Sequence, residues 1–374
     1  MATDTLPRAR HVRVVTVRGT AIRLAPSCLI LVGLLAIAIA PRAELVAPSI
    51  GAGAYLVGAL LGVVVYAAAL VHEAAHAVLA RRYGHDVPSI TLSVTGGRTV
   101  VDGEAATPGE EFITALVGPL VSLAIGAIAL AARLLLDEGV PALALEVLVI
   151  ANLVLGLLDL VPAPPLDGGR LVKAVAWRIV GSPRRGALAA AWGGRVVAVL
   201  LLTAPVIAGP AFGREVLVTD IVLCGAMALL LWSMATNEIA VNRLRIAMEG
   251  VVARDVALAA LTVAPDLPLA EAIRRADEGG TPGIVTIDPD GRLLGVVNQS
   301  AVDAMPAERR PWVDTSSVTR AVSPERCLAA DLSGDHLLRA IHMAPGPEYV
   351  VLEPGGSLIG VLRLADLDRA VHGT

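Results

Sequence analysis

The sequence predicts an α-helical membrane protein with about six transmembrane helices, followed by a cytoplasmic α/β module. Apolar residues make up 55% of the 374 residues and charged residues 17%, and the mean hydropathy is +0.71. These values are too apolar for an ordinary soluble protein. Composition becomes soluble-like after Arg245, so we expect a membrane domain at 1–249 and a module at 250–374. Six apolar stretches approach or exceed the roughly 20 residues that cross a bilayer: 25–41, 52–80, 112–136, 142–161, 193–211 and 216–236.

The placement of Arg and Lys predicts the orientation of these stretches. The N-terminal tail and the segments after the second, fourth and sixth stretches are basic, whereas the opposite loops carry only Arg42 and Arg214 beside several acidic residues. Because cytoplasmic loops are enriched in Arg and Lys, both termini of this multi-pass cell-membrane protein are expected in the cytoplasm. No small-residue cleavage site follows the basic tail, so we expect an uncleaved first helix. The net charge of −4 gives no indication of a nucleic-acid partner.

The second apolar stretch contains the pattern His-Glu-x-x-His, at His72, Glu73 and His76. Residues four apart lie on one face of a helix, so both imidazoles can reach one metal ion. Neutral His nitrogens suit Zn²⁺, and the Glu can take a proton from the water that the metal activates. Ionisable side chains are costly inside a membrane, which favours a functional site over a hydrogen-bonded His pair in a helix bundle.

A catalytic zinc usually has three protein ligands, and Asp167 is the best candidate for the third. The acidic residues at plausible membrane depth are Glu146, Asp159 and Asp167. Three prolines at positions 162–165 end the fourth apolar stretch, because proline cannot continue a helix, and the irregular segment that follows can present Asp167 to the metal. The alternative for Asp167 is a cap of the next helix.

Asp159 lies eight residues before Asp167 and still inside the apolar stretch. A protonated carboxyl group at this position would donate a hydrogen bond to a developing oxyanion, and a carboxylate would orient a metal ligand. Asp159 is therefore a candidate catalytic residue. The alternative is a residue at a helix end whose side chain reaches water.

Residues 86–108 alternate weakly between apolar and polar side chains around Gly96 and Gly97, which predicts a short β-hairpin. Next to the helix of His72, an open strand edge would suit an extended substrate segment. A plain loop with β character is the alternative.

Four motifs occur together in residues 20–240: His72-Glu73-x-x-His76 in an apolar stretch, Gly96-Gly97, Gly118-Pro119, and Pro162-x-Pro164-Pro165-Leu166-Asp167-Gly168-Gly169. With them the chain resembles the site-2 protease family of intramembrane zinc metalloproteases. The resemblance implies one Zn²⁺ per chain on His72, His76 and Asp167, with Glu73 as the general base. It also implies cleavage of single-span membrane proteins, such as anti-sigma factors, within or near their transmembrane helix.

Two positions depart from the pattern of that family. Asn is common where this chain has Asp159, and Asn is frequent where it has Ser122. An ionised Asp159 would repel an oxyanion, so either this carboxyl group is protonated or the activity is altered.

Residues 250–374 repeat with an offset of 65, since Gly283-Ile284-Val285 aligns with Glu348-Tyr349-Val350. Each unit reads as a helix, two short strands and a helix, and the two units, about 250–308 and 315–374, resemble a tandem pair of CBS domains. Such pairs often bind an adenine nucleotide and can form homodimers. The binding signature, Thr or Ser followed by Asp three positions on, is reduced here to Asp366, with Arg363 in place of the hydroxyl residue as a possible partner for a phosphate. A purely structural module is the alternative.

Two other classes of function remain open at this point. A membrane transporter gated by the paired C-terminal units would also place carboxylates within the membrane, although a transport site must release its ion. A pseudo-protease that binds membrane partners without cleavage is favoured only by Asp159.

Overall fold

Six long helices account for most of the first part of the described chain, and each overlaps one of the six apolar stretches of the sequence. The computed structural model describes residues 12–94, 96–211, 213 and 215–372. The predicted polytopic helical fold is confirmed, because six of the described helices are long and apolar enough to cross a membrane. These helices are α1 (Cys28–Val46), α2 (Gly53–Arg82), α3 (Pro108–Arg133), α4 (Val140–Asp159), α6 (Pro183–Ala211) and α7 (Val218–Ala247). Exposed apolar side chains such as Leu56, Ile128 and Leu229 give these helices the outer surface that lipid requires.

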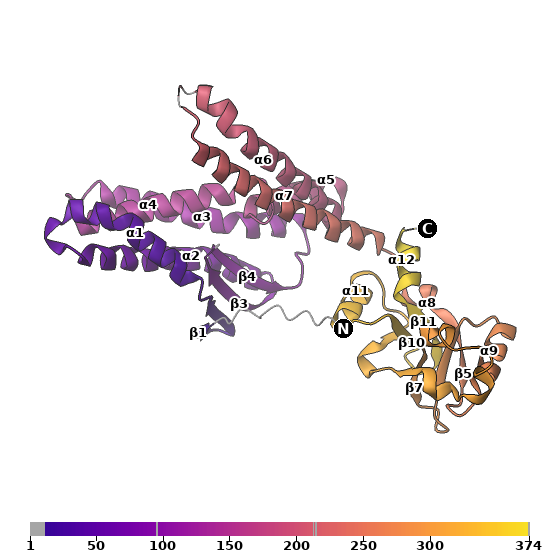
Figure 1. Ribbon diagram of the computed structural model, residues 1–374. Helices are drawn as coiled ribbons and strands as arrows, with labels where there is room; N and C mark the ends of the chain where they lie inside the picture. The colour runs from indigo at the N-terminus through magenta and orange to yellow at the C-terminus, as the bar shows by residue number, and fades with distance from the viewer. Residues whose placement is uncertain (1–11, 95, 212, 214, 373–374) are drawn as a thin grey trace. The chain divides into compact units, whose positions relative to one another are not determined.

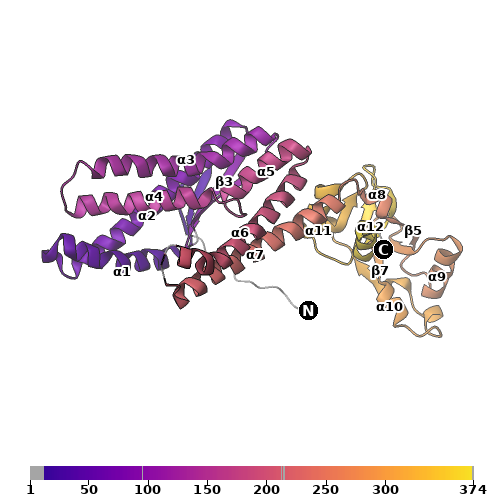
Figure 2. The same ribbon diagram turned by 90° about the horizontal axis from the view of Figure 1, so that it is seen from above.

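The six helices fall into two groups that meet through a short helix, α5 (Asp167–Val180). In both views, α1 to α4 lie side by side as one bundle, and α5, α6 and α7 form the second group (Figures 1 and 2). α3 packs on α2 and α4, and α5 packs on α3 and α6. α3 therefore connects the His-bearing helix with the segment that carries Asp167.

The ends of α3 and α5 follow ordinary capping rules. The Glu110 N–H donates to Thr107 Oγ1 over 3.2 Å, Pro108 is the first residue of α3, and Glu110 and Glu111 lie in its first turn, where the helix dipole favours acidic side chains. α5 ends at Gly181, which has a left-handed conformation with φ of 76°.

A four-stranded sheet, in the order β1-β2-β3-β4, packs on α2. β3 and β4 are the two strands of the hairpin that the sequence predicts. The sequence reading missed β1 and β2, which form a hairpin from residues expected only as a basic tail; β2 then pairs in parallel with β3. Arg8 and Arg10 of that tail lie outside the described residues. The strands are β1 (Val12–Val17), β2 (Thr20–Leu24), β3 (Asp86–Ser93) and β4 (Gly96–Asp102).

The chain divides into two units after Asn242, inside α7. The second unit is built on a seven-stranded sheet in the order β8-β7-β6-β5-β11-β10-β9. Its strands are β5 (Leu258–Val263), β6 (Gly283–Ile287), β7 (Leu293–Val297), β8 (Thr319–Ala321), β9 (Cys327–Ala329), β10 (Glu348–Leu352) and β11 (Leu358–Arg363). Its helices are α8 (Ala253–Val256), α9 (Leu269–Glu278), α10 (Gln299–Asp303), α11 (Gly334–Met343) and α12 (Leu364–His372).

The repeat of 65 residues is visible in these elements. α9 and α11 begin at Leu269 and Gly334, and β6 and β10 begin at Gly283 and Glu348, in each case 65 residues apart. Val285 and Val296 of the first repeat share one buried cluster with Val350 and Val361 of the second. The two repeats therefore form a single α/β module with a common core.

Candidate metal centre

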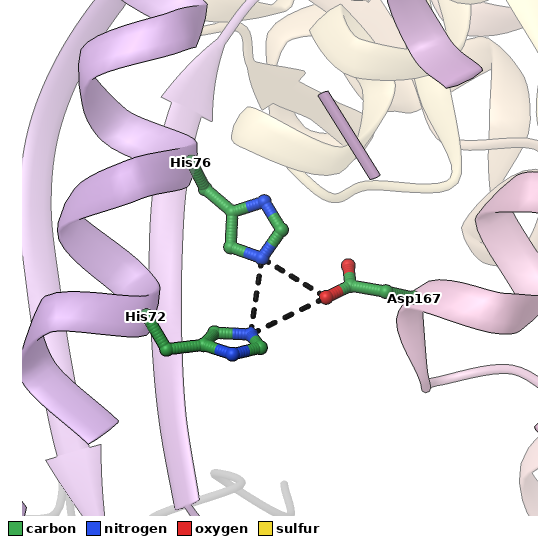
Figure 3. A group of neighbouring side chains, drawn as sticks. All are labelled: His72, His76 and Asp167. Carbon is green, nitrogen blue, oxygen red and sulfur yellow. Dashed lines mark hydrogen bonds and ion pairs between the residues drawn. The ribbon is translucent and has the colours of Figure 1, made fainter. Parts of the chain in front are cut away.

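Two histidines on α2 and an aspartate at the start of α5 point toward one another (Figure 3). His72 and His76 are buried one helical turn apart, and their Nε2 atoms are 3.2 Å from each other. Asp167 Oδ2 lies 2.9 Å from His76 Nε2 and 3.4 Å from His72 Nε2. The sequence motif and the distant Asp167 are thus brought together.

The spacing of these three atoms fits a single zinc ion. Zinc bonds of about 2.0–2.1 Å in tetrahedral geometry hold neighbouring ligand atoms roughly 3.3 Å apart. The three separations here, 3.2, 2.9 and 3.4 Å, lie around that value. Two neutral imidazoles and one carboxylate are also donor types that zinc binds readily.

Both imidazole rings are oriented by α3. His76 Nδ1 donates to the backbone carbonyl of Thr114 over 2.7 Å, and this carbonyl can only accept. The proton of a neutral His76 therefore stays on Nδ1, and the lone pair on Nε2 is left for the side where His72 Nε2 and Asp167 Oδ2 lie. His72 Nδ1 lies 2.9 Å from the hydroxyl oxygen of the fully buried Ser122. Such outer partners fix ring orientation and strengthen metal ligands.

The opposite oxygen of Asp167 has its own partner. Oδ1 lies 3.4 Å from Arg170 Nη1, and Arg170 Nε donates to Glu111 Oε1 over 3.0 Å. Glu111 is a buried residue of α3, and Lys173 also reaches it, at 3.5 Å. Asp167 is the first residue of α5, and no side chain forms a capping hydrogen bond at Leu166, the N-cap. The carboxylate of Asp167 is directed toward the histidines and Arg170.

Glu73 contacts the sheet. The Thr99 hydroxyl donates to Glu73 Oε2 over 2.6 Å and lies 3.1 Å from the Glu73 carbonyl oxygen. A Cβ atom at Gly97 would lie 2.3 Å from Glu73 Cγ, so only glycine lets β4 approach so closely. Gly97 of the Gly96-Gly97 motif therefore has a steric reason, whereas Gly96 has a φ of 115°, which other residues rarely adopt.

Gly118 of α3 allows an equally close approach, in this case of the two histidines to the backbone of α3. A Cβ atom there would lie 2.2 Å from His76 Nε2 and 2.6 Å from His72 Nε2. The Nε2 atoms of both histidines thus lie directly over the backbone of α3, at the Gly118-Pro119 motif.

Asp159 is the last residue of α4, and its Oδ2 atom lies 3.6 Å from His72 Nε2. The structure therefore places both candidate acids, Asp159 and Asp167, beside His72. Sequence reasoning missed the supporting residues Thr99, Glu111 and Thr114, and noted Ser122 only as a departure from a family pattern.

The two residues considered for a nucleotide lie at the end of β11 and the start of α12. Arg363 Nη2 donates to the Pro282 carbonyl over 2.7 Å and so ties the second repeat to the first. Asp366 forms an ion pair with Arg369 through Oδ1, while its Oδ2 atom is buried and has no hydrogen-bond partner among the described residues. The Arg363 side chain is therefore engaged, and one oxygen of Asp366 is not.

Comparison with known proteins gives matches to both parts of the chain. The model of Peptidase family M50 matches residues 136–204, which include Asp159 and Asp167, and the CBS domain model matches residues 251–302. "Putative zinc metalloprotease Rip3" of Mycobacterium tuberculosis is 46% identical over 155 residues. That alignment covers 40% of this chain and only 39% of the mycobacterial protein.

Two further matches extend over more of the chain. "Putative zinc metalloprotease sll0528" of Synechocystis is 26% identical over 375 residues, covering 97% of this chain and 96% of the relative. Among solved structures, the site-2 protease from Methanocaldococcus jannaschii is 24% identical with a TM-score of 0.42, covering 62% of this chain and 95% of that one.

Proposed function

We propose that this protein, which contains a Peptidase family M50 domain in its membrane part and a CBS domain after it, is an intramembrane zinc endopeptidase of the site-2 protease type. One observation carries the proposal: the Nε2 atoms of His72 and His76 and the Oδ2 atom of Asp167 lie within 3.4 Å of one another on helices of the membrane part. Three protein ligands leave one coordination position for water or substrate, as hydrolysis requires.

Bound zinc would polarise the scissile carbonyl group and make the attacking water more acidic. Glu73 then acts as the general base. Its Oε2 atom already accepts the Thr99 hydroxyl, which leaves Oε1 to receive the proton of the water and pass it to the leaving amine. Because Thr99 also contacts the Glu73 carbonyl, it holds both the backbone and the side chain of the base.

Asp159 would serve as a hydrogen-bond donor in its protonated form. Its Oδ2 atom lies 3.6 Å from His72 Nε2, which supports a role in donating a hydrogen bond to an oxyanion that would develop beside bound zinc. If Asp159 were ionised instead, the chain would be a weak or inactive protease that binds membrane partners. Asp159 is the one residue that favours this second candidate function.

The edge strand β4 supports a substrate in extended form. β4 is the last strand of its sheet, so one row of its backbone N–H and C=O groups has no strand partner in the described chain. Gly97 and Thr99 of this strand contact Glu73, so a substrate strand paired with β4 would run beside the general base. A peptide bond in a transmembrane helix must unwind before attack, and pairing with β4 would hold it in extended form. We propose the transmembrane segments of single-span regulatory proteins, such as anti-sigma factors, as substrates.

The C-terminal module is proposed to regulate this activity. We divide the chain into a protease domain, residues 1–249, and two CBS repeats, about 250–308 and 315–374, with both termini in the cytoplasm. The buried and unpaired Oδ2 of Asp366 supports binding of an adenine nucleotide through a ribose hydroxyl. The engagement of Arg363 with Pro282 argues against a phosphate contact from that side chain. A homodimer would form through this module.

The test is a pair of measurements on the full-length protein in lipid. Purified protein should hold about one zinc per chain. Glu73→Ala should retain that zinc and lose cleavage of a single-span membrane substrate, whereas Ala at the exposed Glu308 should change neither. Cleavage by the Glu73 variant at the rate of the parent would refute the assignment, and zinc-independent ion flux would favour a transporter gated by its CBS repeats.

A further inference from the structure

Arg195 is a charged residue at the end of two apolar helical segments. On α6, residues 196–211 contain no charged residue, and on α7 the same is true of residues 221–235. α6 and α7 lie side by side in both views (Figures 1 and 2). Arg195 contacts Trp232 and Thr236 across the helix pair, so both apolar segments end at one level. Where an apolar segment ends beside Trp and Arg, the hydrocarbon of a bilayer gives way to lipid headgroups.

The guanidinium of Arg195 lies between two indole rings. Its Cζ atom is 4.7 Å from the ring centroid of Trp192, on α6, and 4.8 Å from that of Trp232, on α7. Nη2 donates to Thr236 Oγ1 over 3.1 Å, and Nε is buried without an acceptor. Among the described residues, no carboxylate lies within 4.0 Å of this guanidinium. The charge therefore has aromatic and hydroxyl contacts but no anionic partner in the described part of the chain.

The surroundings of Arg195 face lipid. Trp192 and Trp232 are 47% and 43% exposed, and the neighbouring Val196 and Leu200 are exposed apolar residues. A guanidinium at the membrane boundary is stabilised by an anionic partner. The guanidinium group is planar, so its remaining N–H donors point outward in that plane, where a phosphate oxygen can accept their hydrogen bonds with good geometry.

We propose that Arg195, between Trp192 and Trp232, binds the phosphate of an anionic phospholipid headgroup. The site would take a phosphodiester at the depth where the apolar segments end, with the acyl chains along the exposed apolar side chains of α6 and α7. One basic residue near the surface favours an anionic lipid over a zwitterionic one by about five-fold. This inference does not depend on the proposed protease function.

The lipid would lie next to the segment that leads to Asp167. A Cβ atom at Gly194 would be 3.0 Å from Pro164 Cδ, and one at Gly193 would be 3.2 Å from the Pro162 carbonyl oxygen. The part of α6 that carries Arg195 thus packs on the proline-rich segment before α5. A bound headgroup therefore contacts a helix that supports the metal site, without contacting the metal ligands.

Tryptophan quenching in nanodiscs tests the proposal with the full-length chain. The chain has four tryptophans; replacing the exposed Trp312 by Phe leaves Trp177, Trp192 and Trp232 as emitters. At equal mole fraction, phosphatidylglycerol with brominated acyl chains should be about five-fold enriched at the site over brominated phosphatidylcholine, judged by quenching. Arg195→Gln should abolish this preference, whereas the control Arg185→Gln, an exposed Arg of the same helix, should keep it.

Three results would overturn the inference. Equal quenching by the two lipids in the parent protein would exclude an anionic lipid, and this result does not require any variant to fold. A preference that survives in folded Arg195→Gln, checked by circular dichroism, would place the lipid elsewhere. Relief of quenching by millimolar inorganic phosphate or glycerol phosphate would identify a soluble phosphate compound as the ligand instead.

Discussion

Replacing Gly118 by Ala should remove zinc from the protein without unfolding it. The added methyl carbon would lie 2.2 Å from His76 Nε2 and 2.6 Å from His72 Nε2. Contacts between such atoms need about 3.5 Å, so the two rings must retreat by roughly 1 Å. Zinc sites tolerate deviations of only about 0.2 Å in bond length, so rings displaced that far cannot share one ion with Asp167. We expect zinc affinity at least 100-fold below that of the parent.

The same substitution should leave the fold nearly as stable as before. Alanine is favoured over glycine inside a helix by about 0.8–1.0 kcal/mol, which offsets much of the roughly 0.5–1.5 kcal/mol lost with each hydrogen bond, to Thr114 or Ser122, that an imidazole gives up when it turns away from the methyl group. The variant should therefore lose its zinc and still unfold at nearly the same temperature as the metal-free parent. This separates loss of the site from loss of the fold.

The assay is zinc per chain by mass spectrometry after dialysis, together with titration against a chelator of known affinity. Gly225→Ala on α7 is the matched control, because a Cβ atom there meets nothing within 4 Å. It gains the same helix propensity and should keep one zinc. If the Gly118 variant binds zinc as tightly as the parent, the two His rings are not held over α3 as described.

Substitutions at three further positions test the surroundings of the site. Thr99→Val removes the hydroxyl that holds Glu73 and should lower the rate of substrate cleavage by about 10–100-fold while zinc content stays at one per chain; loss of zinc instead would mean that Thr99 supports the metal ligands. Arg170→Gln removes the partner of Asp167 Oδ1 and should weaken zinc binding by about 10–100-fold in a chelator titration. The control is Arg178→Gln, at an exposed Arg of the same helix. Unchanged zinc affinity of the Arg170 variant would show that α5 is held without Arg170. Asp159→Asn should keep cleavage within about ten-fold of the parent, since the amide still donates, whereas Asp159→Ala should lose about 10²–10³-fold; a parent protein that is inactive until Asn is introduced would identify it as a pseudo-protease.

Much of the membrane fold could be predicted because its signals are local. A run of apolar residues long enough to cross a bilayer is visible without knowledge of its neighbours, and His72 and His76 share a helix face by spacing alone. The hairpin of β3 and β4 is also local. The β-branched residues of Val12–Val17 are a strand signal too, but β2 pairs in parallel with β3, more than 60 residues later. Such a pairing leaves no periodic trace in the sequence. The hairpin of β1 and β2 is itself local, and it was missed because its Arg residues were interpreted as a basic tail.

The partners of the metal ligands were missed for a related reason. Ser122, Glu111 and Thr99 act through hydrogen bonds to residues between 26 and 59 positions away. Thr114 acts through its backbone carbonyl, which any residue type provides. Candidate metal ligands and a candidate general base can be found in a sequence by residue type and spacing. The residues that form hydrogen bonds to them can be found only once the packing of the helices is known.

α3 shows how one helix without a metal ligand organises the whole site. Glu111, Thr114, Gly118 and Ser122 are spaced by three, four and four residues, so they form one stripe along the helix. Glu111 holds Arg170 beside Asp167, and the Thr114 carbonyl accepts a hydrogen bond from His76. Gly118 leaves space for both imidazole rings, and Ser122 contacts His72. The candidate ligands on α2 and α5 therefore meet because both sets of side chains are held by contacts with the same face of α3. Gly118 lies in the middle of this stripe, next to the Nε2 atoms of both histidines, so Gly118→Ala is expected to displace both histidines together rather than one ligand alone.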